Sequence, residues 1–242
     1  GQVELTMDAK RRSFSSQKGS RATAGDSVIL TLDSTIQFAA EQALQKTVES
    51  TRAINGSAIV MNPQNGEILA MASYPPFNPN LYNTDQTRNQ RNRAIQDSYE
   101  PGSTFKVVTL AAVLDQGMTT IDETIDCRVG TLRLAGKVYR EASRSYSELR
   151  VDEILAKSSN VGTIKLALRL GNQKFYEYIK RFGFGEPTGI DLPFEVKGRL
   201  RTPPEWSRLS IGALAIGQEL SVTALQMVRA VSVIANGGYL VE

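Results

Sequence analysis

The chain has 242 residues, with 28 Lys and Arg side chains against 25 Asp and Glu, no histidine and one cysteine. These counts exclude nucleophilic triads that use histidine, metal sites built from histidine, zinc sites built from several cysteines and a disulfide within the chain. The length allows one large domain or two small ones, and no apolar run approaches the ~18 residues of a membrane span. Any catalysis must therefore use Ser, Thr, Lys, Tyr, Asp or Glu.

The excess positive charge lies at the start of the chain. Residues 1–22 hold five basic and two acidic side chains, so the remaining residues are neutral overall. A nucleic-acid-binding protein usually has a basic stripe on its folded part, and we therefore expect no nucleic-acid partner. Residues 1–27 are polar and have no sustained apolar period, which predicts an extended or mobile connector before a domain over 28–242.

The domain is predicted to begin with a strand and a helix. Val28–Leu32 is a short run of the apolar and β-branched residues that favour strands. Asp33 or Ser34 can cap the helix that follows, and apolar residues at helical spacing extend it to about Glu49.

A β-hairpin and a long loop are expected next. The apolar runs Ala58–Met61 and Ile68–Ala72 flank the turn sequence Asn62–Gly66, which is typical of a hairpin. Residues 74–100 lack periodicity and predict a long loop, and loops of this length in compact domains are often functional.

The rest of the chain predicts buried helices and one glycine-rich turn. Each of these helices is followed by a glycine, as a left-handed C-terminal cap prefers. The segment Phe182–Gly189 has glycines at the wrong spacing for a dinucleotide-binding loop, so we interpret it as a structural turn. The predicted helices cover about residues 104–116, 161–170 and 222–235.

A serine and a lysine three residues apart form the first chemical motif. Ser103 follows Pro101-Gly102 at the start of a predicted helix, and Lys106 shares its helical face. One interpretation is structural, with Ser103 as a helix cap and Lys106 extending to water. The other is an activated nucleophile, because a lysine in an apolar helix has a lowered pKa and can act as a base.

A second polar cluster lies between two predicted helices, in the sequence Lys157-Ser158-Ser159-Asn160. By itself this sequence is typical of a capping loop. Ser158 and Asn160 alternate along the loop, however, so both side chains can point into one cleft.

The two motifs and several further segments together resemble a known family. From about residue 24 to its end, the chain resembles the transpeptidase domain of class B penicillin-binding proteins. These proteins belong to the serine acyl-enzyme superfamily, which includes β-lactamases. The resemblance implies an α+β fold, described as an α/β/α sandwich. The segments are Leu30–Asp33, Ile36-Gln37, Asn62–Ala72, Tyr99–Lys106, Ser158–Gly162, Phe182–Leu192, Ile216–Gln218, Thr223, Gln226 and Ala235–Gly238.

The resemblance implies a D,D-transpeptidase that cross-links peptidoglycan stem peptides ending in D-Ala-D-Ala. Ser103 would be the nucleophile and Lys106 its base. Ser158 would relay a proton to the leaving amine, and Asn160 would hydrogen-bond the backbone of the acyl donor. Penicillins and other β-lactams would acylate the same serine, and the chemistry would need no metal or organic cofactor.

One motif of the family is not found. A Lys-Thr/Ser-Gly sequence on a later strand would follow the helix that ends near Asn236, and it does not occur before Glu242. We therefore expect only the first strands of the central antiparallel sheet and weak or no acylation of this chain by penicillin. Because an isolated two-stranded hairpin is marginally stable, we also expect the Ala58–Met61 edge to pair with another copy or a separate polypeptide, or the chain to be poorly ordered there.

Three alternatives stay open at this point. A β-lactamase shares the Ser-x-x-Lys sequence but needs an activated water for deacylation, which no residue here specifically supplies. A β-lactam sensor, or a non-catalytic scaffold among other cell-wall synthesis proteins, would keep the fold with a different role.

The resemblance also implies a location. Family members act on the extracytoplasmic (periplasmic) side of the bacterial cell membrane and are held there by an N-terminal transmembrane helix. Because the chain begins with Gly1 instead of Met, we interpret it as a processed product or a part of a longer protein, and residues 1–22 as the end of a connection to that anchor.

Overall fold

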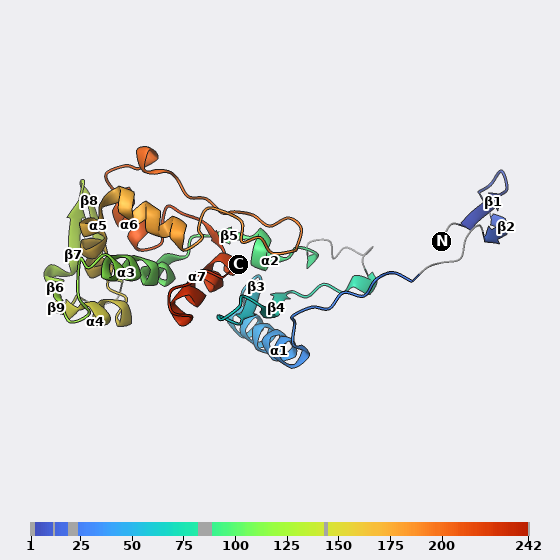
Figure 1. Ribbon diagram of the computed structural model, residues 1–242, viewed down its shortest axis with the longest axis horizontal. Coiled ribbons are helices and arrows are strands. Elements are labelled where there is room, and N and C mark those ends of the chain that lie inside the picture. Colours follow the sequence, from blue (N-terminus) through green and yellow to red (C-terminus); the bar gives the residue numbers. More distant parts are fainter. Residues whose placement is uncertain (1–2, 12, 19–23, 82–88, 143–144, 242) are drawn as a thin grey trace. The chain divides into compact units, whose positions relative to one another are not determined.

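The structure is a computed structural model that describes residues 3–11, 13–18, 24–81, 89–142 and 145–241 (Figure 1). The chain divides into two compact units, Gly1–Thr31 and Leu32–Glu242. Among the described residues, none of the helices is long and apolar enough to span a membrane. In chain order the α-helices and strands are β1 (Val3–Met7), β2 (Ser13–Lys18), α1 (Ser34–Thr51), β3 (Gly56–Met61), β4 (Ile68–Tyr74), α2 (Arg93–Gln96), β5 (Ser98–Tyr99), α3 (Lys106–Asp115), β6 (Thr124–Asp126), β7 (Thr131–Leu134), β8 (Lys137–Arg140), β9 (Glu148–Arg150), α4 (Val151–Ala156), α5 (Asn160–Arg181), α6 (Ser210–Ala215), β10 (Val222–Thr223) and α7 (Ala224–Ala235).

The first unit contains an antiparallel strand pair that the sequence did not indicate. β1 and β2 pair with Val3 opposite Lys18, and their register shifts between Thr6 and Met7. The two strands are held by backbone hydrogen bonds. Because the segment is polar overall, it lacks an alternation of apolar and polar residues along both strands that would have indicated a strand pair. The connector over residues 1–27 and the domain boundary after it stay predictions.

The predicted strand at Val28–Leu32 is wrong. The segment forms no ladder with any described strand, and Ile29 is 95% exposed. Its residues favour a strand, but propensity stabilises a strand only where cross-strand partners exist. The predicted helix is confirmed as α1, and the Asp33 carboxylate caps it by accepting hydrogen bonds at 2.9 Å from the backbone N–H groups of Thr35 and Ile36.

The predicted hairpin is confirmed as β3 and β4. The two strands pair with Ala58 opposite Ala72, and the turn closes with a 2.9 Å bond from the Gly66 N–H to the Asn62 carbonyl. Helix α1 lies along the hairpin (Figure 1), where the Gln37 side chain exchanges two hydrogen bonds with the backbone of Met71. The odd-numbered apolar residues of β3 pack instead against the buried cluster of α2 and α7.

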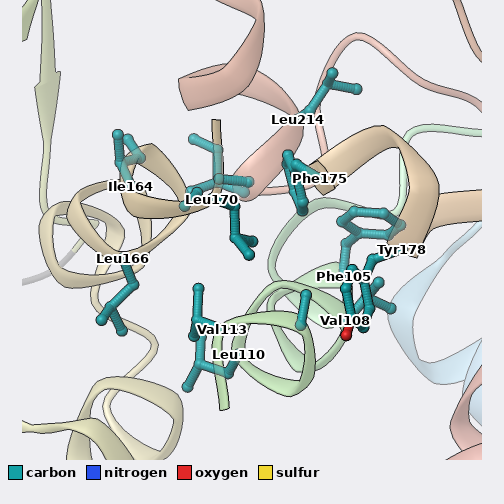
Figure 2. Close-up of a cluster of buried hydrophobic side chains, with 14 of the residues drawn as sticks. Phe105, Val108, Leu110, Val113, Ile164, Leu166, Leu170, Phe175, Tyr178 and Leu214 are labelled. Carbon is teal, nitrogen blue, oxygen red and sulfur yellow. The ribbon is translucent and has the colours of Figure 1, made fainter. Parts of the chain in front are cut away.

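The largest hydrophobic core joins helices α3, α5 and α6, and Figure 2 shows its central side chains. The predicted helices over 104–116 and 161–170 correspond to α3 and the first part of α5. Gly171 has a φ of 71° and interrupts the helical backbone, after which α5 continues to Arg181. In the predicted turn after α5, Phe184 is fully buried and its ring centroid lies 5.2 Å from that of Phe105. This core holds the start of α3 in place.

Residues 74–100 are less irregular than predicted. Part of the segment, residues 82–88, lies outside the described residues. The remainder contains α2 and β5, and Ala94 and Ile95 of α2 are fully buried beside Leu225 of α7. Strand β5 pairs with β10, so the chain enters the Ser103 region from an anchored segment.

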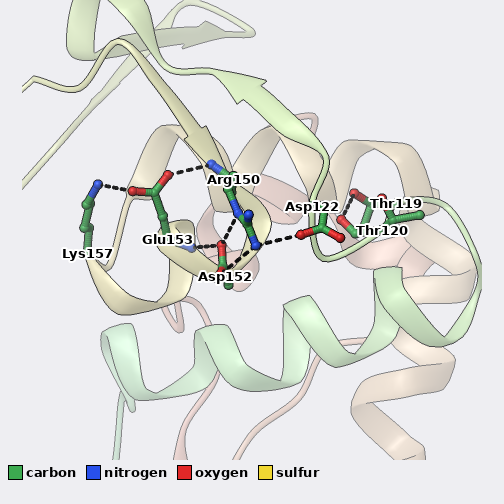
Figure 3. Close-up of polar contacts among 7 residues, drawn as sticks. All are labelled: Thr119, Thr120, Asp122, Arg150, Asp152, Glu153 and Lys157. Carbon is green, nitrogen blue, oxygen red and sulfur yellow. Dashed lines mark hydrogen bonds and ion pairs between the residues drawn. The ribbon is translucent and has the colours of Figure 1, made fainter.

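Polar contacts define both ends of helix α4 (Figure 3). At its start, the Arg150 N–H donates to a Glu153 carboxylate oxygen at 3.0 Å, and the Arg150 guanidinium pairs with Asp122 at 2.7 Å. At its end, the Lys157 ammonium lies 2.5 Å from the same Glu153. Ser158 directly follows Lys157, so the contact between Lys157 and Glu153 lies at the end of α4, where the chain turns toward Ser158 and Asn160.

Candidate active site

Ser103 lies in a tight turn directly before helix α3. The turn is a 3₁₀ helix over Gly102–Phe105, and Gly102 adopts a left-handed φ of 57°. Ser103 is exposed, and its hydroxyl has no hydrogen-bond partner among the described residues. It does not act as the helix cap that the structural interpretation of the motif required. The hydroxyl is therefore free to react.

The segment after helix α6 supports this turn. The Gly102 N–H donates to the Gly217 carbonyl at 2.9 Å, and the Glu219 N–H donates to the Glu100 carboxylate at 3.0 Å. Gly217 has a φ of 74°, and a Cβ atom built on it would lie 2.1 Å from the Gly102 carbonyl oxygen. Only glycine allows the two backbones to approach this closely.

Lys106 is buried at the first position of α3, with none of its surface exposed. Its Nζ atom donates to the Ser158 carbonyl at 2.6 Å, the Ser158 Oγ at 3.0 Å and the Asn160 Oδ1 at 2.7 Å. Because an ammonium has three hydrogens, these acceptors satisfy it fully. The structural interpretation, in which Lys106 extends to water, is wrong because the core around α3 covers the side chain.

Burial changes the acid–base properties of this lysine. Loss of hydration lowers the pKa of Lys106 from 10.5 to about 8, and the negative charge of Glu141 partly opposes that shift. A lysine in this range carries a usable fraction of neutral amine near pH 7 to 8. The site can therefore accept a proton from a hydroxyl group next to it.

The turn between α4 and α5 places Ser158 and Asn160 against the lysine. Ser158 has a φ of 53°, an unusual value for a residue with a side chain. Ser159 caps α5 by accepting from the Gly162 N–H at 3.0 Å. Within Ser158-Ser159-Asn160, the predicted helix cap is therefore Ser159, and the residues on either side of it contact Lys106. The Asn160 Nδ2 donates to the Arg140 carbonyl at 2.8 Å, which fixes the amide with its oxygen toward Lys106.

The structure thus brings Lys106, Ser158 and Asn160 into direct contact and places Ser103 one turn before Lys106. Ser158 and Asn160 lie together because both accept a hydrogen bond from Lys106, and the cleft expected for their side chains stays a prediction. Glu141 was not among the residues expected at the site from the sequence; its carboxylate accepts from the Ser159 hydroxyl and the Asn160 N–H. No local pattern links these residues, because 18 and 19 positions separate them.

Other features of the described chain do not contribute to this site. No group of three or more His, Cys, Asp or Glu residues that could hold a metal occurs in the described ranges. Cys127 is fully buried, and burial raises the pKa of its thiol. A surface cavity of about 970 Å³ contains none of the four candidate residues; it is lined by Asn55, Gly56, Ser57, Arg91, Arg93, Gln96, Asp97, Ser98, Tyr99, Val196, Lys197, Gly198, Arg199, Ser221 and Ala224.

Comparisons with known proteins identify the family of the chain. A family model described as the penicillin binding protein transpeptidase domain matches residues 56–242. The chain is 36% identical over 219 residues to penicillin-binding protein PbpB of Mycolicibacterium smegmatis, covering 90% of this chain and 34% of the relative. It is 34% identical over 218 residues to the probable peptidoglycan D,D-transpeptidase PbpC of Pseudomonas aeruginosa, covering 90% of this chain and 38% of that protein.

A solved structure gives the same result for the fold. The apo transpeptidase domain of penicillin-binding protein 3 from Burkholderia pseudomallei superposes with a TM-score of 0.79 at 30% identity, covering 87% of this chain and 59% of the other. The predicted α+β fold is confirmed. The chain combines this fold with a Ser-x-x-Lys sequence and with a buried lysine beside a Ser-x-Asn turn. Its class is therefore that of transpeptidase-like domains. The chain belongs to the penicillin-binding protein transpeptidase domain family, and it spans about a third of the length of the curated relatives named above.

Proposed function

We propose that this protein is a peptidoglycan D,D-transpeptidase that cross-links stem peptides through an acyl-enzyme on Ser103. The observation that carries the proposal is the fully buried Lys106 ammonium, 2.6 to 3.0 Å from atoms of Ser158 and Asn160 and one turn after an exposed serine. A serine with a neighbouring base of lowered pKa is the requirement for nucleophilic attack on an amide carbonyl.

The proposed first step is acylation. The neutral amine of Lys106 takes the Ser103 hydroxyl proton while Oγ forms a bond to the carbonyl carbon of the penultimate D-Ala. The tetrahedral intermediate then collapses and breaks the C–N bond to the terminal D-Ala, whose nitrogen receives a proton. Backbone N–H groups in the first turn of a helix have no intrahelical acceptor, so those near Ser103 are suited to stabilise the developing oxyanion.

Ser158 would relay that proton. Its Oγ lies 3.0 Å from the Lys106 Nζ and accepts from it when the lysine is charged. A serine hydroxyl both donates and accepts, so it can pass one proton to the leaving nitrogen while taking another from the lysine. In the second step, an amine from a neighbouring strand attacks the ester carbonyl and gives a proton to Lys106. The new C–N bond remains, the C–O bond to Ser103 breaks, and the Ser103 Oγ takes the proton back from Lys106.

Asn160 would bind the acyl donor. Its Oδ1 accepts from Lys106, and one hydrogen of its Nδ2 is donated to the Arg140 carbonyl. An amide nitrogen carries two hydrogens, so the second is available for a backbone carbonyl of the stem peptide. Asn160 therefore positions both the base and the substrate.

The test is acylation by fluorescent penicillin, followed by intact-mass and peptide mapping, with this chain and with the product of the complete gene. In the product of the complete gene we expect one penicilloyl group on Ser103, lost in Ser103→Ala and retained in the control Ser98→Ala, which removes an exposed hydroxyl in β5. In this chain we expect weak or no labelling. Labelling that persists in Ser103→Ala contradicts the proposal. Rapid release of hydrolysed penicillin would instead support a β-lactamase.

We also propose that the open edge of β3 pairs with a strand of a second copy. Among the described residues, β3 forms a ladder with β4 and with no other strand. Exposed strand edges pair readily with other chains. Light scattering and amide hydrogen exchange test this: a dimer with protected β3 amides supports it, and a monomer with fully protected hairpin amides contradicts it.

The proposed substrate also implies a location and partners. Stem peptides of the cell wall lie outside the cytoplasm, so we propose that the protein acts on the extracytoplasmic side of the membrane, held by an N-terminal anchor and working with other cell-wall synthesis proteins. Alkaline phosphatase fused to the product of the complete gene should be active in intact cells. An inactive fusion with normal expression contradicts this placement.

A further inference from the structure

Glu141 links strand β8 to the start of helix α5. It follows Arg140, the last residue of β8, and its own N–H donates to the Gly130 carbonyl at 3.1 Å. One carboxylate oxygen accepts from the Ser159 hydroxyl at 2.6 Å, and the other accepts from the Asn160 N–H at 2.7 Å. Both oxygens of the side chain are therefore engaged with consecutive residues of the Ser-x-Asn turn.

These two contacts determine how the turn is oriented. Ser159 is fully buried and has one hydroxyl hydrogen, which it donates to Glu141, so its lone pairs are directed to the Gly162 N–H that it caps. The Asn160 N–H belongs to the first turn of α5, where a negative charge is stabilised by the helix dipole. A carboxylate satisfies both donors, whereas a neutral side chain has at most one acceptor oxygen for them.

The same segment holds the Asn160 side chain. The Arg140 carbonyl accepts from the Asn160 Nδ2, so Arg140 and Glu141 together hold both the amide side chain and the backbone of one residue. The Asn160 Oδ1 then points to Lys106. The end of β8 is thus connected to the lysine through Asn160.

We propose that Glu141 is a positioning residue of the acyl-transfer site, which holds Ser158 and Asn160 against Lys106 and supplies the negative charge that faces the lysine. This inference rests on the proposed function for the roles of Lys106 and Ser158. Two consequences follow, one geometric and one electrostatic, and a residue with only a structural role would have the first without the second.

The electrostatic consequence has a definite sign. Desolvation lowers the pKa of Lys106, and Glu141 is the charged group among the described residues that opposes it. The groups that contact the amine, from the turn and from α5, are all neutral: the Ser158 carbonyl and the side chains of Ser158 and Asn160. Removing the Glu141 charge therefore lowers the pKa of Lys106 further, and the neutral amine persists to lower pH.

The test compares Glu141→Gln and Glu141→Asp with the control Glu148→Gln. Glu148 is the first residue of β9, and its exposed carboxylate forms an ion pair with Arg128. The first measurement is the titration of the Lys106 Cε resonance, identified by its loss in Lys106→Arg. We expect a lower midpoint in Glu141→Gln, and a midpoint near that of the wild type in Glu141→Asp and in Glu148→Gln. An unchanged or higher midpoint in a folded Glu141→Gln overturns the proposal.

The second measurement is the pH profile of penicillin acylation in the product of the complete gene. Glu141→Gln should reduce the maximal rate by about tenfold or more and move the acidic limb to lower pH. Glu141→Asp should reduce the maximal rate and leave the limb in place, because the shorter side chain keeps the charge. A reduced rate with an unmoved limb in Glu141→Gln overturns the electrostatic role. If the wild type is not acylated, the proposed function fails, whereas the lysine titration still decides the role of Glu141.

Discussion

The Lys106 ammonium donates a 2.7 Å hydrogen bond to the Asn160 side chain across 54 residues of sequence. This bond joins the first residue of α3 to the first residue of α5, two helices that pack together in the main core. The position of the proposed base and the position of the amide proposed to bind substrate are therefore coupled. Changes in either residue should be detected in the titration of the lysine.

The first prediction concerns the pH dependence of acylation. Lys106 is mostly charged below its pKa, and only its neutral form can be the proposed base, so the rate should rise with pH and level off above about 8. At pH 7, about a tenth of the amine would be neutral, compared with well under a thousandth for an ordinary lysine. Acylation rates between pH 6 and 9.5, corrected for uncatalysed hydrolysis, measure this. A flat profile would show that Lys106 is not the base.

The second prediction concerns Asn160→Asp. The substitution places a carboxylate where the Oδ1 atom now accepts from Lys106, so it should raise the pKa of the lysine by about one unit or more. The acidic limb of acylation then moves to higher pH, opposite to the effect of Glu141→Gln. Lysine titration by NMR measures the shift, with Asn160→Ala as the control that adds no charge. A limb that moves to lower pH in Asn160→Asp contradicts the assigned contact.

The third prediction concerns Gly217→Ala. Its Cβ atom would lie 2.1 Å from the Gly102 carbonyl oxygen, so the substitution should lower the free energy of unfolding by more than about 2 kcal/mol and displace the Ser103 turn. The control is Gly136→Ala, at a φ of 89° with nothing within 4 Å, where only the backbone conformation is strained and about 1–2 kcal/mol is expected. Urea denaturation compares them, and equal losses would show that the close approach does not matter.

The fourth prediction concerns Cys127. The thiol is fully buried, its Sγ atom lies 3.8 Å from the Ser159 Oγ, and burial raises its pKa. It should therefore react slowly with a thiol reagent at pH 8 in the folded protein, and rapidly after denaturation. The measurement is the ratio of the two rates, for which we expect at least a hundredfold difference. Comparable rates would place the thiol at the surface.

Elements that depend on neighbouring residues were predictable from the sequence. The cap of α1, the turn of the hairpin and the glycine at the interruption of α5 each follow from contacts or backbone preferences within a few positions. The Ser-x-x-Lys and Ser-x-Asn motifs were recognised for the same reason. The strand predicted at Val28–Leu32 failed because a strand needs a partner that local sequence does not specify.

By itself, the sequence determined that any catalysis must do without histidine, and that a serine and a lysine share the start of one helix. Only the tertiary structure decided that the lysine is buried instead of solvated, since packing of α3 against α5 removes its hydration. It also brought Glu141 to the Ser-x-Asn turn from 18 and 19 residues away. The pKa of a side chain depends on burial and on charges that are close in space, and neither can be read from positions along the chain.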